Sequence, residues 1–379
     1  MPSHVTSGPD KPWHHHLTLD LFVKVLANSV FHPFVAWLVP LCLRAIQAPY
    51  ESKEFIAACV YASSITLLWM LSIINKRVAY GAPREVDWNE EVVMITGGAS
   101  GLGKIMAEIF GMRGANVAII DVAKPEKESE GLAGVQVYQC DVGDAAAVES
   151  VKERIENDVG LQDTVYTCVL LLIVFCFQLG TPTILINNAG IVNGKPIWEL
   201  STKDVQRNFN VNLLSHFNTI RTFLPGMLKS ETGGTIVTVA SVLGKLGASY
   251  LSDYCAAKAG LIAMHKTLRA EMSSPTAPEG AENIRMVLVT PGQLATPLFA
   301  ELETPSNFVG PVVEPVELAR EIVKMIDAGE SGEVSLPFYA RCVELTNALP
   351  AGIDRLVRWV SAIDRAMEKV HARRAEKVK

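Results

Sequence analysis

Tyr254 and Lys258 stand four residues apart in the run YCAAK, and they are the side chains in this sequence best suited to acid–base chemistry. At this spacing both lie on one face of a helix. A phenol with a pKa near 10 is a poor base at neutral pH, but an adjacent ammonium stabilises the phenolate and lowers that pKa. Ser241, at the end of a predicted strand, can hydrogen-bond an alcohol or carbonyl oxygen. These residues predict a site that exchanges a proton with an oxygen atom of a bound molecule.

A glycine-rich turn, TGGASGLG at residues 96–103, follows one predicted strand and begins a predicted helix. Glycine permits a tight turn and lets the backbone approach a pyrophosphate, which then rests on the N-terminal amides of the helix. The turn therefore predicts a dinucleotide-binding site. Its residues are Gly97, Ser100, Gly101, Leu102 and Gly103.

Asp121 ends the next predicted strand, where a carboxylate can accept both ribose hydroxyls of the adenosine half. The same carboxylate repels a 2′-phosphate, and the first basic residue after it is Lys124. The sequence therefore favours NAD(H) over NADP(H). The alternative is that Asp121 only caps a turn or lies at the surface. Asp141 and Val142, which end the third predicted strand, are expected to border the adenine.

Six short β-rich runs alternate with helical patterns from residue 91 onward. They are residues 92–98, 116–121, 135–142, 183–190, 234–241 and 284–292. Strands that alternate with helices form right-handed βαβ units around a parallel sheet. We expect an α/β fold, a Rossmann-type doubly wound parallel sheet, as a catalytic domain over residues 84–337.

These motifs resemble, in order and spacing, those of the short-chain dehydrogenase/reductase superfamily over roughly residues 90–300. The resemblance implies a nicotinamide cofactor and a catalytic tetrad, with Asn212 holding a water molecule that relays protons to Lys258. It implies that Thr296 contacts the carboxamide of the cofactor, and that Asn188 and Pro291 border it. The residues that carry the resemblance are Gly97, Gly101, Gly103, Asn188, Ala189, Gly190, Asn212, Ser241, Tyr254, Lys258, Pro291 and Gly292.

Within the superfamily, the apolar N-terminus and the form of the glycine turn resemble the membrane-associated retinol and hydroxysteroid dehydrogenases. This implies an enzyme that interconverts a lipophilic alcohol with its ketone or aldehyde. It also implies a place at the endoplasmic reticulum or on lipid droplets, with the catalytic domain in the cytosol. The alternative is a non-catalytic membrane scaffold that binds a nucleotide or a lipid.

The N-terminal region carries the expected membrane anchor, residues 17–80, after a polar tail at residues 1–16 that we expect to be disordered. Residues 55–74 contain no charge and give about 30 Å of helix, which matches the core of a bilayer. Residues 25–43 contain Pro33 and Pro40, so a kinked span and an interfacial helix both remain open. Flanking positive charges favour a hairpin with both ends cytosolic.

Composition excludes several other classes of function. The net charge of −6 and the lack of a basic run argue against a nucleic-acid partner. The seven cysteines show no C-x-x-C pair, and the three histidines at 14–16 have no acidic or cysteine neighbour, so we expect no metal site.

Residues 161–180 interrupt the βα pattern with an apolar stretch, between a charged helical pattern and the strand run at 183–190. A transmembrane span is excluded here, because it would separate strands that must pair in one sheet. Three interpretations remain open: retained intron sequence, a membrane-facing insertion and a functional lid. Joining residue 160 to residue 181 would leave a loop of ordinary length.

Residues 338–379 form a tail in which apolar clusters alternate with basic residues. This pattern is typical of an interfacial or substrate-covering helix. It equally fits a helix packed on the catalytic domain or on the second subunit of a homodimer.

Overall fold

The computed structural model describes residues 17–123, 134–157 and 181–378, apart from 303, 305 and 362. The apolar stretch 161–180 and the tail 1–16 lie outside the described residues. The chain divides into two compact units. One comprises the chain up to Ala82 with Ser306–Pro311, and the other comprises Pro83–Pro305 with Val312–Lys379.

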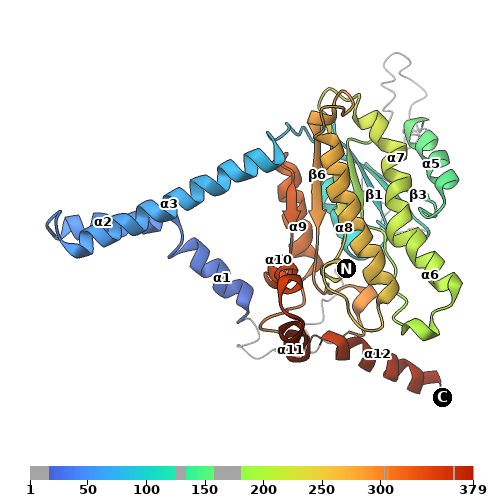
Figure 1. Cartoon of the computed structure of the whole chain (residues 1–379). Coiled ribbons are helices and arrows are strands. Elements are labelled where there is room, and N and C mark those ends of the chain that lie inside the picture. Colours follow the sequence, from blue (N-terminus) through green and yellow to red (C-terminus); the bar gives the residue numbers. More distant parts are fainter. Residues whose placement is uncertain are drawn as a thin grey trace, which may run out of the picture. The chain divides into compact units, whose positions relative to one another are not determined.

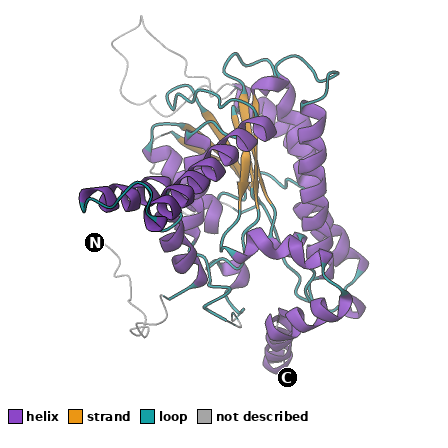
Figure 2. Ribbon diagram, turned by 60° about the vertical axis from the view of Figure 1, so that its left-hand side comes forward, coloured by secondary structure: helices purple, strands orange, loops and turns teal. Residues whose placement is uncertain are grey.

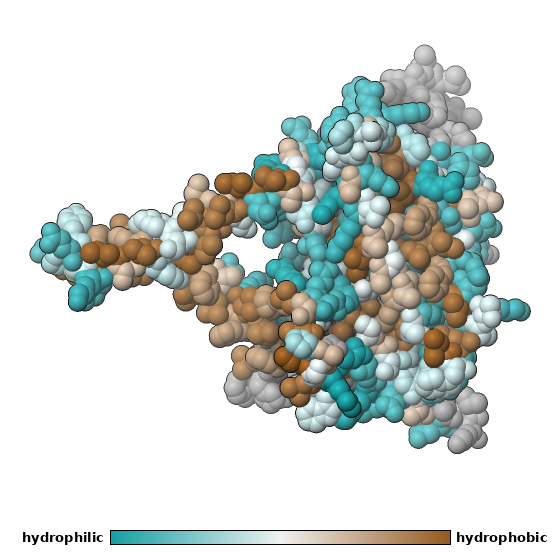
Figure 3. All heavy atoms as spheres, in the orientation of Figure 1, coloured by the Kyte–Doolittle hydropathy of each residue, from teal (hydrophilic) through white to brown (hydrophobic). Residues whose placement is uncertain are grey.

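The N-terminal unit consists of three helices, α1 (Leu19–Asn28), α2 (Pro33–Ala45) and α3 (Lys53–Tyr80). Ser52 caps α3 by accepting a hydrogen bond from the Phe55 amide, and the helix ends at Gly81, which has a φ of 76°. The indole of Trp37 in α2 donates to the Thr66 hydroxyl of α3 at 3.0 Å. Most other side chains of these helices are exposed, and Figure 3 shows the apolar ones in brown along their surface.

Helix α3, with 28 residues, is long and apolar enough to cross a membrane. Helices α1 and α2 pass the same criterion only as a pair, which is bent by 51° at the break between them. Pro33 begins α2 after this break, whereas Pro40 lies inside the helix. The kink expected in the first apolar stretch therefore lies just before Pro33.

The second unit is built on a seven-stranded parallel sheet with the order β3-β2-β1-β4-β5-β6-β7. Its strands are β1 (Val92–Thr96), β2 (Asn116–Asp121), β3 (Val135–Gln139), β4 (Ile184–Asn187), β5 (Gly234–Val239), β6 (Ile284–Val289) and β7 (Gly332–Val334). The chain crosses from one side of β1 to the other between β3 and β4. Ligands of such folds bind at this switch point, beyond the carboxyl ends of the strands.

Helices cover both faces of the sheet (Figures 1 and 2). Successive strand residues point to opposite faces. Val93 and Ile95 accordingly pack with α4 (Gly101–Met112) and α9 (Pro315–Asp327), whereas Met94 packs with α5 (Ala145–Asn157) and α7 (Ser215–Met227). The doubly wound α/β sheet expected from the sequence is confirmed.

The remaining elements lie around this sheet in the second unit. They are η3 (Ile197–Glu199), α6 (Thr202–Phe209), the π-helical turn η4 (Asn210–Leu214), η5 (Val242–Gly244), α8 (Ser252–Met272), η6 (Ala281–Asn283), η7 (Pro297–Phe299), α10 (Tyr339–Cys342), η8 (Val343–Ala348), α11 (Ala351–Ser361) and α12 (Ile363–Val378).

Two details of the strands differ from the expectation. Strand β7 was not predicted, because it is three residues long and the charged Glu333 stands at its centre. Five of the six predicted runs extend past their strands into the turns that follow; β4, for example, ends at Asn187 rather than at residue 190. These extra residues are the ones that build the site.

Candidate active site

The glycine turn between β1 and α4 is shaped by close backbone approaches. Gly97 has a φ of 67°, and a Cβ there would lie 2.8 Å from the Cα of Ala189. A Cβ on Gly103 would lie 2.3 Å from the carbonyl oxygen of Gly97. Asn188, which follows β4, holds the turn through its Nδ2, which donates to the carbonyl oxygens of Thr96 and Gly97. Only glycine fits at the two tight positions.

The N-terminus of α4 suits a phosphate group. Ser100 is the N-cap residue, but its side chain makes no capping hydrogen bond, and the first turn contains no acidic residue. The amides of this turn are therefore available to an anion, which the helix dipole also favours. Thr296 lies beside the turn, since a Cβ on Gly101 would be 3.6 Å from its Cγ2. These residues fit the pyrophosphate of a dinucleotide cofactor.

Asp121 ends β2 next to this turn. Its Oδ2 accepts a hydrogen bond from the Ala99 amide and its Oδ1 accepts one from the Ala123 amide, both at 3.0 Å. The carboxylate thus fixes the turn, as the capping alternative expects. Its side chain remains partly exposed, so the carboxylate also places a negative charge beside the turn, where the ribose interpretation expects it.

Tyr254, Ser241 and Lys258 gather beyond the end of β5, and all three are buried. The Lys258 Nζ donates to the Val239 carbonyl oxygen at 2.9 Å and lies 5.7 Å from the centroid of the Tyr254 ring. The Ser241 Oγ accepts a hydrogen bond from the Leu243 amide at 3.1 Å. The spacing of Tyr254 and Lys258 on α8 thus places both on one face of the helix.

Asn212 lies in the π-helical turn η4 and is fully buried. Its Oδ1 accepts from the Ile191 amide at 3.0 Å, and its Nδ2 donates to the Ile191 carbonyl oxygen at 2.8 Å. A Cβ on Gly190 would lie 3.1 Å from this Oδ1 and 3.7 Å from the Lys258 Nζ. Asn212 and Lys258 therefore flank the same glycine.

Burial dominates the proton affinities of the site. Burial raises the pKa of Tyr254, and a hydrogen bond from Ser241 lowers it only in part. Burial also lowers the pKa of Lys258 to about 8, so Lys258 is mainly protonated at neutral pH. Contrary to the expectation from the sequence, Lys258 does not lower the pKa of the Tyr254 phenol in this structure. The ammonium donates to the Val239 carbonyl and lies beside the ring instead.

The remaining candidate residues, Pro291, Asp141 and Val142, lie after the ends of β6 and β3. Pro291 follows β6, and its carbonyl oxygen accepts from the Val242 amide at 2.9 Å, beside Ser241. Val142 is buried, whereas the Asp141 Oδ1 accepts from the Gly143 amide at 2.9 Å. Asp141 lines a surface hollow together with Lys203 and Arg207. Asp141 is thus engaged in a local turn.

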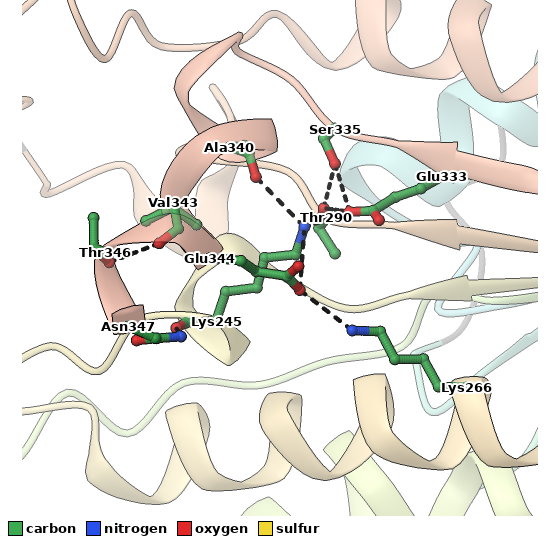
Figure 4. A network of polar contacts seen from close by, with 10 residues as sticks. All are labelled: Lys245, Lys266, Thr290, Glu333, Ser335, Ala340, Val343, Glu344, Thr346 and Asn347. Carbon is green, nitrogen blue, oxygen red and sulfur yellow. Dashed lines mark hydrogen bonds and ion pairs between the residues drawn. The ribbon is translucent and has the colours of Figure 1, made fainter. Parts of the chain in front are cut away.

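The sequence did not identify a network of polar contacts that follows Ser241 (Figure 4). Lys245 is 3% exposed and forms an ion pair with Glu333 of β7, which also accepts hydrogen bonds from Thr290 and Ser335 at 2.8 Å. Burial raises the pKa of Glu333, but the interaction with Lys245 and the hydrogen bonds from Ser335 and Thr290 together outweigh burial and lower that pKa. The network thereby attaches the loop after β5, which contains Ser241, to β7, the last strand.

Two buried histidines, His216 on α7 and His265 on α8, were also missed, because a lone histidine in an apolar helix pattern does not indicate a site. The Nδ1 of His265 lies 3.0 Å from the Thr238 hydroxyl, and burial lowers its pKa to about 4. Burial lowers the pKa of His216 as well.

We expect His265 to make the protein acid-labile. As the pH falls below 6.5, His265 becomes protonated in the unfolded chain, whereas in the folded chain it stays neutral down to about pH 4. The free energy of unfolding therefore decreases as the pH falls from 6.5 toward 4. The full shift corresponds to about 3 kcal/mol. Thermal midpoints at pH 7 and 5 should differ less in His265→Gln than in the wild type. The exposed His32→Gln is the control, and an unchanged difference in His265→Gln contradicts the expectation.

The fold and the site together define a nicotinamide-binding α/β oxidoreductase. The family model of short chain dehydrogenases matches residues 91–171 and 176–307, and the chain belongs to this family. The match is interrupted at residues 172–175, inside the apolar stretch 161–180. The protein is therefore an oxidoreductase, and the alternative of a non-catalytic scaffold is set aside.

Several known proteins are similar to this chain. An uncharacterised oxidoreductase of Saccharomyces cerevisiae, TDA5, is 29% identical over 354 residues, which cover 90% of this chain and 98% of the relative. Human retinol dehydrogenase 10 is 32% identical over 57% of this chain and 65% of its own length. The structure of 4-hydroxyisoleucine dehydrogenase complexed with NADH has a TM-score of 0.52 at 22% identity, covering 65% of this chain and 97% of that one. The last likeness supports the fold.

Proposed function

We propose that this protein is a membrane-anchored, NAD(H)-dependent dehydrogenase that interconverts a lipophilic alcohol with its ketone or aldehyde. The observation that carries the proposal is the convergence of the buried Ser241, Tyr254 and Lys258 beyond the end of β5. Leu251, Val192 and Phe299 surround Tyr254 with apolar side chains, which suits a lipophilic substrate. The similarity to retinol dehydrogenase 10 supports the same substrate class.

The residues divide the chemistry between them. The glycine turn, Asp121 and Thr296 would hold the nicotinamide cofactor, which would supply or accept the hydride. Ser241 and Tyr254 hydrogen-bond the substrate oxygen, and Tyr254 exchanges its proton with that oxygen. Lys258, mainly protonated at neutral pH, exchanges a proton with Tyr254, and Asn212 positions the water that connects Lys258 to solvent.

A panel of lipid alcohols tests this proposal. Retinol, steroid alcohols and long-chain alcohols are assayed with the full-length protein in detergent micelles, each with NAD and with NADP. We expect turnover of at least one lipophilic alcohol with NAD, and short polar alcohols of the same concentration to react far more slowly. Turnover restricted to polar alcohols or sugars contradicts the proposed substrate class.

Asp121 should set the choice of cofactor. Asp121→Asn keeps an acceptor for the Ala99 amide but removes the charge, and Val122→Arg adds a phosphate partner at a side chain that is 60% exposed. We expect the double variant to shift the ratio of kcat/KM for NADP(H) over NAD(H) by at least about tenfold, equivalent to 1.4 kcal/mol. Asp121→Asn alone should shift it less. An unmodified enzyme that already prefers NADP(H) contradicts this assignment.

Helix α3 should be the membrane anchor, at the endoplasmic reticulum or on lipid droplets, with the catalytic unit in the cytosol. Its 28 residues give about 42 Å of helix, more than the roughly 30 Å core of a bilayer. Deleting residues 1–80 should therefore move the protein from the membrane pellet to the supernatant, whereas deleting residues 1–16 alone should not. Pelleting that survives the longer deletion and an alkaline wash places the anchor elsewhere in the chain.

A further inference from the structure

Helix α12 buries an apolar pair against the catalytic tyrosine. Met367 and Val370, three residues apart and therefore on one face of the helix, are 4% and 3% exposed. They form one buried cluster with Leu251 and Tyr254. The edge of the Tyr254 ring also faces Phe299, with 6.2 Å between the ring centroids.

Polar contacts hold α12 on three other segments of the catalytic unit. The Arg374 Nε donates to the Glu301 carboxylate at 2.7 Å, beyond η7. The Nε2 of His371 lies 2.9 Å from the Glu199 carboxylate in η3. The Asp364 Oδ1 accepts from the amide and hydroxyl of Ser249, before α8. These segments lie far apart in the sequence, and α12 joins them. We call α12 in this position the cover of Tyr254.

Side chains of α12 lie close to Gly194 and Tyr250. A Cβ on Gly194 would lie 3.1 Å from the Met367 Cε and 3.3 Å from the Arg374 Nη1. The Tyr250 and His371 rings pack with tilted planes at a centroid distance of 5.1 Å. Tyr254 itself is only 4% exposed under this cover. A substrate that reaches the Tyr254 hydroxyl must therefore lie against α12 or displace it.

We propose that Met367 and Val370 of α12 form the wall of the substrate site opposite Tyr254, and that they determine which substrates are accepted by size. The ion pair Arg374–Glu301 and the hydrogen bond between His371 and Glu199 hold this wall in place. The proposal deepens the proposed function and rests on its lipophilic substrate. The wall itself is built from Met, Val, Leu and Phe side chains, which offer a substrate no polar partner and favour hydrocarbon.

The first experiment changes the size of the wall. Full-length Met367→Ala and Met367→Phe are assayed in detergent micelles with a bulky and a slender alcohol that the wild type oxidises. Met367→Ala should raise the ratio of kcat/KM for the bulky over the slender alcohol at least fivefold, and Met367→Phe should lower it. Met112→Ala, at a side chain 72% exposed on α4, is the control. A ratio that stays within twofold in both variants overturns the proposal.

A second readout does not depend on turnover. Cys255 follows Tyr254 on α8 and packs against the same apolar cluster, so its alkylation by a maleimide reports opening of the cover. Mass spectrometry follows Cys255, with exposed Cys342 as the internal reference. Arg374→Glu should accelerate the alkylation of Cys255 at least threefold, and the added Glu301→Arg should restore the slow rate. Arg113→Glu, which breaks the ion pair with Asp327 on the far helices α4 and α9, should have no effect.

The two readouts separate the two proposals. Accelerated alkylation without turnover of any lipophilic alcohol overturns the proposed substrate class and leaves α12 as the cover of the site. Turnover of lipophilic alcohols with unchanged alkylation and unchanged size preference overturns the role of α12 alone.

Discussion

Tyr254→Phe should reduce turnover by roughly 10²–10⁴-fold, the range that general acid–base catalysis contributes. The variant keeps the ring that packs against Phe299 and Met367, so the apolar cluster stays filled. It removes only the hydroxyl group that exchanges a proton with the substrate oxygen. The loss should therefore appear in kcat.

Cofactor binding separates this role from a structural one. The affinity for NADH, measured by fluorescence titration, should stay within threefold of the wild type, because the glycine turn is untouched. Tyr138→Phe is the control, since Tyr138 is also buried but lies under α5, away from the site. Turnover above a tenth of the wild-type value in Tyr254→Phe would remove Tyr254 from the proton transfer.

Gly103→Ala should disrupt the cofactor site and destabilise the catalytic unit together. Its Cβ would lie 2.3 Å from the Gly97 carbonyl oxygen and 2.9 Å from the Gly98 Cα, and backbone atoms cannot yield as the end of a side chain can. Overpacking of this kind costs about 1–3 kcal/mol. In a domain of this size that corresponds to a fall of several degrees in the thermal midpoint.

The displaced turn should also lose contact with the pyrophosphate, so we expect the dissociation constant for NADH to rise at least about tenfold. Gly247→Ala is the matched control, because a Cβ at Gly247 has no atom within 4 Å. An alanine at 103 that leaves both the thermal midpoint and the NADH affinity unchanged contradicts the close packing described for this turn.

Local patterns in the sequence predicted much of the fold. A parallel strand that is buried on both faces reads as a continuous apolar run, as in Val92–Thr96, and the glycine turn after it follows from the same few residues. The Tyr254 and Lys258 pair was predictable because one helical turn fixes its geometry. Strand β7 was not, since three residues with Glu333 exposed at the centre show no period.

Contacts between distant segments explain the rest. The prediction that Asn188 borders the cofactor did not include the hydrogen bond that its side chain donates to the carbonyl oxygen of Gly97, 91 residues earlier. The tail was open to several interpretations because its apolar pattern fits each of them. The structure separates its two helices: α12 packs on the catalytic unit, whereas Ile353, Leu356 and Trp359 of α11 are exposed.

The position of α12 in the chain bears on how the protein is made. All seven strands precede residue 335, and α12 begins at Ile363, so the sheet and the glycine turn leave the ribosome before the helix that covers Tyr254. Domains generally fold as units, and α12 belongs to the same compact unit as the sheet. The catalytic unit can therefore complete its fold only after residues 363–378 have been synthesised. A chain that stops before α12 is expected to leave the apolar side chains beside Tyr254 without the contacts of Met367 and Val370.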